Sequence, residues 1–242
     1  MSKLRRGTAP APLDRCRLIV SADDFGISRK ANHNILRLIS LGKIDRVSVM
    51  VRGGLEPVEL ALLVQSGVKL DIHWDTGDCI SGSASRHIAP APLRILLFLF
   101  HYVSGSHGAE VIEGLWRNQM EKFKQLFGRY PDGVNSHEHI HFFPPYFRVA
   151  CALGRHYGAS HLRFGTKGIF PRMNLQAQVI DWLRRTDQRG VMEGPIPSSE
   201  YMTSLNWKPD LQDLTDCHPH GRVEVVCHPE VDEEFDYTRD RL

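Results

Sequence analysis

Several features are scarce in this sequence, and each scarcity argues against a class of protein. Cysteine accounts for only five of the 242 residues and forms no CxxC pair, which argues against a disulfide framework. The apolar run at residues 93–100 is too short to span a bilayer. The net charge is +2, so no broad electrostatic attraction to nucleic acid or to an acidic membrane is expected. We therefore expect a cytoplasmic protein without membrane insertion and without a nucleic-acid partner.

Length and composition predict one large globular domain. Apolar residues make up 42% of the chain and charged residues 24%, which is ordinary for a globular protein. Residues 1–16 contain Pro10 and Pro12 and no apolar stretch of signal-peptide length, so we expect a flexible N-terminal segment there. Residues 17–242 contain no internal repeat and no linker-like stretch, and we assign them to a single domain.

Strand-like and helix-like segments alternate along the chain. The predicted strands are 17–21, 47–51, 69–73, 133–137, 161–164 and 223–227, with a weaker candidate at 190–193. The predicted helices are 30–41, 56–65, 93–102 and 109–127, the last with Val111, Leu115, Phe123 and Leu126 as its apolar face. Residues 77–92 are rich in Ser, Gly, Ala and Pro and predict a loop that reaches over a site. The alternation favours an α/β fold with a parallel sheet, closed as a barrel or doubly wound.

Two adjacent carboxylates, Asp23 and Asp24, follow the apolar run Leu18–Ile19–Val20. At close range they repel each other, and burial raises the pKa of at least one of them. A divalent cation relieves that repulsion, and a proton-transfer role makes use of it. Taken alone, however, the pair is more typical of a solvated turn before Gly26.

Three further predicted strands end in side chains that bind metals or transfer protons. The last strand ends at His228, directly before Pro229, which stops strand pairing. In the other two, the period of two predicts a shared face made by Asp71, His73 and Asp75 and, for as long as the strand lasts, one made by His137, His139 and His141.

The carboxyl ends of parallel strands meet at one edge of a sheet, so we expect Asp24, His73 and His137 to converge. One carboxylate and two imidazoles leave coordination positions open for water and substrate, as a hydrolytic metal site requires. Each piece alone has a plainer explanation, since His73 also fits a hydrogen-bonded interior histidine and His228 a strand end. Their occurrence together at four strand ends predicts a metal-dependent active site.

The same residues resemble the motifs of the YdjC/ChbG-like carbohydrate deacetylases. The matching segments follow the family's order and approximate spacing from about Arg17 to near the C-terminus: Ala22–Gly26, Leu70–His73, Asn135–His141 with Pro144 after it, and Glu224–Pro229. The resemblance implies a distorted (β/α) barrel that removes an N-acetyl group from an amino sugar or oligosaccharide. It also implies one divalent cation, Mg²⁺ or Zn²⁺, and by analogy a homodimer.

The resemblance carries roles over to individual positions. The implied metal ligands are Asp24, His73 and His137, and the implied proton-transfer groups are Asp23 as base and His228 as acid. Arg163 lies where the family often has a basic residue near the site, and we place it among the substrate contacts. We also place Asn135 among the substrate contacts; it stands where the family has Asp. From the residues themselves, Trp74 beside a predicted ligand is a candidate for stacking on a sugar, with Trp207 as a second.

Two alternative functions, the identity of the metal and the C-terminal end of the domain stay open from the sequence. The chain could be a non-catalytic sugar- or metal-binding member of the fold, or a metal-dependent hydrolase of another bond such as a phosphoester. Ligand softness favours Zn²⁺ for two imidazoles and one carboxylate, whereas Mg²⁺ is often assigned in the family that the chain resembles. The sequence stops at Leu242, about where we expect the family's last helix to begin.

Overall fold

The computed structural model describes residues 15–76, 108–190, 196–217 and 220–242. Within these residues, eight strands form one sheet in the order β5-β4-β3-β2-β1-β8-β7-β6, and every neighbouring pair is parallel. The strands are β1 (Leu18–Phe25), β2 (Arg46–Val49), β3 (Lys69–Trp74), β4 (Gly133–Ser136), β5 (His161–Leu162), β6 (Gly168–Phe170), β7 (Tyr201–Ser204) and β8 (Val223–Cys227).

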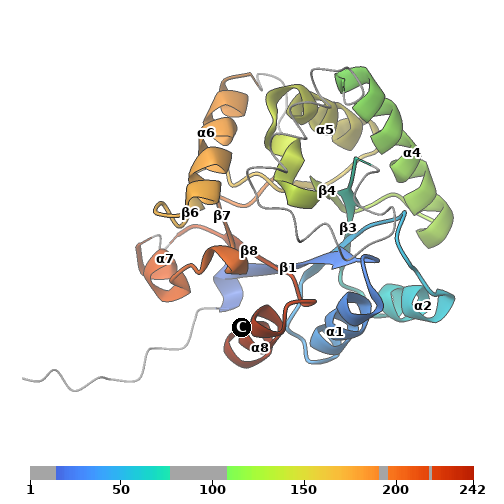
Figure 1. Ribbon diagram of the computed structural model, residues 1–242, viewed down its shortest axis with the longest axis horizontal. Helices are drawn as coiled ribbons and strands as arrows, with labels where there is room; N and C mark the ends of the chain where they lie inside the picture. Colours follow the sequence, from blue (N-terminus) through green and yellow to red (C-terminus); the bar gives the residue numbers. More distant parts are fainter. Residues whose placement is uncertain (1–14, 77–107, 191–195, 218–219) are drawn as a thin grey trace, which may run out of the picture.

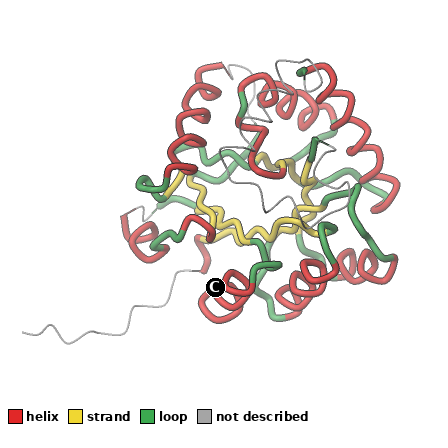
Figure 2. The backbone as a smooth tube through the Cα atoms, viewed as in Figure 1, coloured by secondary structure: helices red, strands yellow, loops and turns green. Residues whose placement is uncertain are grey.

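The sheet curls on itself and the helices lie around its outside (Figures 1 and 2). Its strand order is that of a (β/α) barrel that stays open between β5 and β6. Near this opening the N–H of Leu162 donates to the carbonyl of Pro197, in the segment that leads into β7. The predicted α/β fold, a distorted barrel of parallel strands, is therefore confirmed.

Seven helices and three short 3₁₀ turns connect the strands of the described residues. The helices are α1 (Arg29–Ser40), α2 (Pro57–Gln65), α4 (Ala109–Phe127), α5 (Pro144–His156), α6 (Leu175–Gly190), α7 (Leu211–Cys217) and α8 (Asp232–Arg241), and the 3₁₀ turns are η1 (Arg15–Arg17), η3 (His137–Phe142) and η4 (Leu205–Trp207). Helix α1 is capped and amphipathic. Ser28 Oγ accepts from the N–H of Ala31 at its start, and Ile35 and Leu38 are buried against the sheet.

The six main predicted strands and three of the predicted helices are present, with ends shifted by a few residues. The predicted helix 93–102, the loop 77–92 and most of the weak strand 190–193 lie outside the described residues, and Gly190 itself ends α6. Strands β6 and β7 were not predicted, because both are short and lack an extended apolar run. Of the apolar face predicted for α4, Phe123 is buried and Leu115 and Leu126 pack at the edge of the core, but Val111 is 53% exposed. The buried face is centred instead on Ile112, Trp116, Met120 and Phe123.

The concave side of the curled sheet is polar and buried. Arg163, which follows β5, hydrogen-bonds Glu224 on β8, Asp23 on β1 and Ser48 on β2. In the sheet order β5 is separated from β2, β1 and β8 by at least β4 and β3, so the bonds cross the interior of the curl. Apolar side chains on the convex side pack under the helices and form the core. A buried polar interior of this kind positions a site at the carboxyl ends of the strands.

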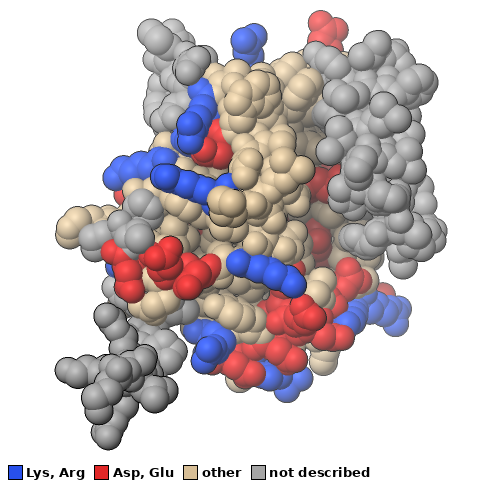
Figure 3. Space-filling view, turned by 60° about the vertical axis from the view of Figure 1, so that its left-hand side comes forward, with Lys and Arg blue, Asp and Glu red and all other residues tan. Residues whose placement is uncertain are grey.

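No helix among the described residues is long and apolar enough to cross a bilayer. On the face drawn in Figure 3, acidic and basic side chains intermingle over the lower part of the surface. This mixture agrees with the small net charge of +2.

Candidate metal centre and active site

A local irregularity in β1 turns both adjacent aspartates toward the site. In a regular strand, neighbouring side chains point to opposite faces of the sheet. The register of β1 against β2 shifts between Ala22 and Phe25, and Asp24 has a φ of 70°. A bulge of this type bends the strand locally and re-aims one side chain. Asp23 and Asp24 can therefore serve the same site although they are consecutive.

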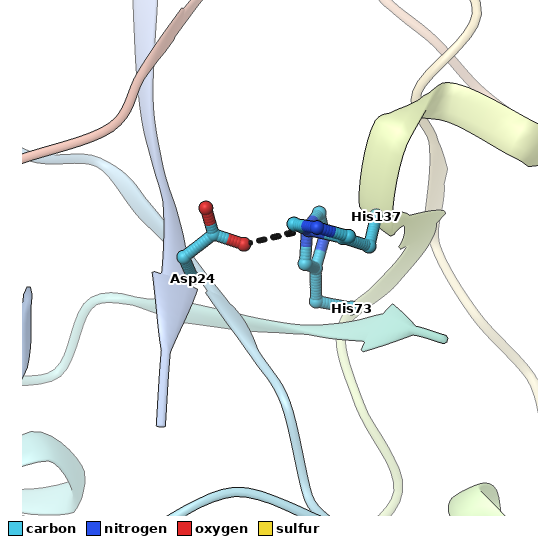
Figure 4. Close-up of side chains that lie close together, drawn as sticks. All are labelled: Asp24, His73 and His137. Atoms are coloured by element: carbon cyan, nitrogen blue, oxygen red, sulfur yellow. Dashed lines mark hydrogen bonds and ion pairs between the residues drawn. The ribbon is translucent and has the colours of Figure 1, made fainter. Parts of the chain in front are cut away.

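Asp24, His73 and His137 converge as the sequence predicts (Figure 4). The Oδ1 atom of Asp24 lies 3.2 Å from Nε2 of His73 and 2.9 Å from Nδ1 of His137. One donor atom from each residue can be chosen so that all three lie within 4.8 Å of one another. Asp24 comes from β1, His73 from β3 and His137 from the first position after β4.

The three histidines after β4 do not share a face, because the strand on which that prediction depended ends before them. Strand β4 ends at Ser136, and Glu138 and His139 adopt positive φ values of 53° and 57°. The chain turns there instead of continuing the pleat, and only His137 is directed at Asp24.

His141 has a structural role instead. Its Nδ1 pairs with the hydroxyl of Ser136 at 2.7 Å, and its Nε2 donates to the carbonyl of Arg163 at 2.9 Å. Burial lowers the pKa of His141 to about 3, so the ring is neutral and ties η3 to the end of β5.

The Nδ1 atom of His73 pairs with the side-chain oxygen of Asn135, whose Nδ2 donates to Ser48 Oγ at 2.9 Å. With its amide oriented in this way, Asn135 accepts the Nδ1–H of His73 and leaves Nε2 of that ring directed at Asp24. Asn135 is fully buried and its two bonds serve the ligand histidine. This is the position that we assigned to substrate contact.

Replacing Asn135 with Ala is expected to weaken metal binding by roughly 10–100-fold, because His73 loses the partner that fixes its tautomer and orientation. The matched variant Asn135→Asp keeps an acceptor for His73 and should retain the affinity. Competition for the cation against a chelator of known affinity measures both. Equal affinity of Asn135→Ala and wild type would contradict this role.

Asp23 is held by a buried guanidinium. Arg163 donates from Nη1 and Nη2 to the two carboxylate oxygens of Asp23 at 2.6 and 2.8 Å, and from Nε to Glu224 at 2.8 Å. Burial raises the pKa of Asp23, but the charges of Arg163 and His73 outweigh it and hold the pKa well below its usual range. Asp23 is therefore ionised at neutral pH, which is the state that a proton acceptor requires.

The charges around the site leave room for a cation. Asp23, Asp24 and Glu224 all have lowered pKa values, with burial opposing and neighbouring cationic groups prevailing. Against these three carboxylates stand the guanidinium of Arg163 and the imidazole of His228, whose pKa is raised to about 9, so one negative charge is left uncompensated. Burial lowers the pKa of His137, but the charge of Asp24 outweighs it and raises that pKa, which shows that this corner of the site favours a positive charge. A cation bound at the site balances that excess. The donor set also fits, because one carboxylate and two imidazoles are common ligands of divalent metals.

His228 follows β8 and is oriented by helix α8. Glu234 accepts from the backbone N–H of His228 at 2.7 Å and pairs with its Nδ1 at 3.2 Å. Burial lowers the pKa of His228, but the bond to Glu234 and the charges of Asp24 and Asp23 outweigh it and raise the pKa to about 9. The ring is therefore protonated at neutral pH and can donate a proton.

Two predicted substrate contacts, Trp74 and Arg163, are buried and offer no surface to a substrate. Trp74 is fully buried and stacks on Trp116 with ring centroids 4.6 Å apart, so it presents no open face to a sugar. Arg163 is also fully buried, and its bonds go to carboxylates of the protein. Asp71 pairs with Arg46 and Asp75 with Arg52, away from the three converging ligands.

The sequence reasoning missed three supporting residues: Ser48, Glu224 and Glu234. Glu224 falls inside the last matching motif, so a charged residue on a buried strand was the available signal. No sequence signal pointed to Ser48 or Glu234.

Known proteins resemble this chain over most of its length. The family model described as "YdjC-like protein" matches residues 17–241. A chitooligosaccharide deacetylase of Escherichia fergusonii is 25% identical over 220 residues, covering 88% of this chain and 81% of the relative. A carbohydrate deacetylase of Halalkalibacterium halodurans is 26% identical over 221 residues, covering 88% and 84%. The crystal structure of an Enterococcus faecalis protein named for cellobiose-phosphate cleavage superposes with a TM-score of 0.59 at 18% identity, covering 87% and 80%, which shows a shared fold.

Proposed function

Since the chain belongs to the YdjC-like protein family, we propose that it is a metal-dependent hydrolase that removes an N-acetyl group from an amino sugar or oligosaccharide. The observation that carries the proposal is the convergence of Asp24, His73 and His137 beside a carboxylate, Asp23, that Arg163 holds ionised. The names of the relatives, which are carbohydrate deacetylases, support the substrate class.

Asp24, His73 and His137 would hold the cation. When bound, a divalent cation supplies Lewis acidity, which lowers the pKa of water and polarises an acetyl carbonyl. Two imidazoles and a carboxylate suit Zn²⁺ by ligand softness, and Mg²⁺ is the second candidate.

The protein's own groups move the protons. Asp23, fixed by both guanidinium nitrogens of Arg163, accepts a proton from the attacking water. The C–N bond of the amide then breaks, and His228 donates its proton to the departing nitrogen. Acetate and a free amine are the products. At neutral pH Asp23 is ionised and can accept a proton, and His228 is protonated and can donate one.

A purely binding member of the fold is less well supported. Keeping the buried Asp23 ionised needs a buried arginine, and buried charge pairs are costly to desolvate. Metal binding by Asp24 and two histidines does not need that arrangement. The cytoplasmic location and the homodimer stay predictions.

Metal content and acetate release test the proposal together. Elemental analysis should find about one divalent cation per chain in the wild type and none in His137→Ala, while the exposed control His33→Ala keeps it. The wild type should release acetate from N-acetylated chito-oligosaccharides, and His137→Ala should not. Absence of metal from the wild type contradicts the metal centre, and metal without acetate contradicts the substrate class.

Replacing Glu234 with Gln is expected to shift the basic limb of the pH–rate profile downward by about one pH unit. The protonated form of His228 is the donor, so activity is lost as pH rises through its pKa of about 9. Removing the charge of Glu234 lowers that pKa and brings the loss to lower pH. The control is Glu233→Gln, the exposed neighbour on α8, which should leave the profile unchanged. A basic limb that does not move in Glu234→Gln argues against His228 as the acid.

A further inference from the structure

A cavity lies at the opposite edge of the sheet from the candidate active site. It has a volume of about 640 Å³ and is lined by residues at the beginnings of strands, among them Leu18, Arg46, Lys69 and Arg222. In the sheet register Leu18 pairs with Val223 and Arg46 with Lys69, so the amino ends of these strands are neighbours. The predicted metal ligands stand at the carboxyl ends of the strands, so this cavity is a separate site.

The lining of the cavity carries more positive than negative charge. Arg15 is paired with Asp45 at 2.8 Å, and both line the cavity. Lys69 reaches Asp132 at 3.5 Å in an exposed contact, which screening by solvent weakens. The guanidinium of Arg222 has no hydrogen bond or ion pair with any described residue, although its backbone N–H is bound. The cavity therefore presents at least one uncompensated cationic group.

One buried hydroxyl and one edge of a guanidinium on the cavity wall also lack partners. Ser199 is 2% exposed, and its Oγ has no hydrogen-bond partner. A buried hydroxyl left unpaired costs about 1–3 kcal/mol, so such atoms are rare unless a ligand or water meets them. Arg46 is 9% exposed and uses Nε and Nη2 for Asp71, which leaves Nη1 without a partner among the described residues. A hydroxyl and the open edge of a guanidinium are donors that match the oxygens of a phosphate group.

We propose that this cavity binds a small oxyanion, a phosphate group that is free or esterified to a sugar-sized molecule. Arg222 and Arg46 supply the charge, and Ser199 supplies a neutral donor. The volume falls within the range of small-molecule pockets, so it accommodates a body larger than the phosphate itself. None of these residues belongs to the metal or proton-transfer groups, so the proposal does not depend on the proposed activity.

Isothermal titration calorimetry on the full chain at constant ionic strength tests it, with inorganic phosphate, glucose 6-phosphate and glucose as probes. We expect one saturable site for phosphate or its ester and none for glucose. Arg222→Gln should weaken binding about 10-fold or more, and Ser199→Ala about 5-fold. Arg185→Gln, which removes the same charge from α6 outside the cavity, should have no effect.

The two phosphate probes distinguish the sources of the anion. Tighter binding of glucose 6-phosphate than of phosphate identifies an esterified ligand, and the reverse identifies the free ion; both support the site. Absence of saturable binding for both probes overturns the proposal. So does binding that Arg222→Gln and Ser199→Ala leave unchanged, or that Arg185→Gln weakens equally. Because Arg222 is exposed, its variant should fold, and a circular dichroism melt verifies this.

Discussion

Replacing Asp23 with Asn is expected to lower the rate of deacetylation by roughly 10²–10⁴-fold while metal content stays near that of the wild type. The amide cannot accept the proton of the attacking water, so the contribution of general base catalysis is lost. Metal should stay because Asp24 is the carboxylate nearest both imidazoles, with Oδ1 3.2 Å from His73, whereas the Asp23 carboxylate lies 3.9 Å from that ring. Acetate release and elemental analysis on the same preparation measure both quantities.

The matched control is the same substitution one residue later. Asp24→Asn removes a ligand charge, so it should lose metal and activity together. The two variants differ only in which of two adjacent carboxylates is neutralised, which separates the base from the ligand. Loss of metal in Asp23→Asn, with metal retained in Asp24→Asn, would falsify this division of roles.

Replacing Arg163 with Met is expected to lower the free energy of unfolding by about 3–5 kcal/mol. The guanidinium is fully buried between Asp23 and Glu224, so the variant leaves two buried carboxylates without their principal cation. The pKa of Asp23 is lowered in the folded protein, so this stabilisation is present at neutral pH. It is lost as pH falls below the ordinary pKa of Asp, about 4.

Urea denaturation at pH 7 measures this effect, and a double variant isolates its cause. In the Asp23→Asn background, one of the two carboxylates that would lose their cation is already neutral. Arg163→Met should therefore lower the free energy of unfolding less there than in the wild type. Equal costs in both backgrounds, or a loss below about 1 kcal/mol, would show that Arg163 is not stabilised by its charge partners. If Arg163→Met fails to fold, Arg163→Lys answers the same question, because it keeps the charge but not the pair of hydrogen bonds to Asp23.

Local sequence pattern was sufficient to predict the bounds of some elements. Strand β8 has the predicted residues 223–227, and α4 the predicted residues 109–127, because both are runs with a clear period. On α4 the prediction was right for Phe123 and wrong for Val111, since Val111 and Ile112 are equally apolar in sequence and only Ile112 is buried. Trp116 stacks on Trp74, and this contact between distant segments decides which side of α4 is buried.

The sequence by itself determined the alternating parallel fold and the chemical types at the strand ends, including Asp24, His73 and His137. These follow from short-range periodicity and from the rule that parallel strands present their carboxyl ends at one edge. The tertiary structure alone decided the direction of each side chain: the bulge at Asp24 and the turn after His137. It also decided that Arg163 binds Asp23 across the sheet. One backbone dihedral or one distant partner sets each of these directions, and neither leaves a periodic trace in the sequence.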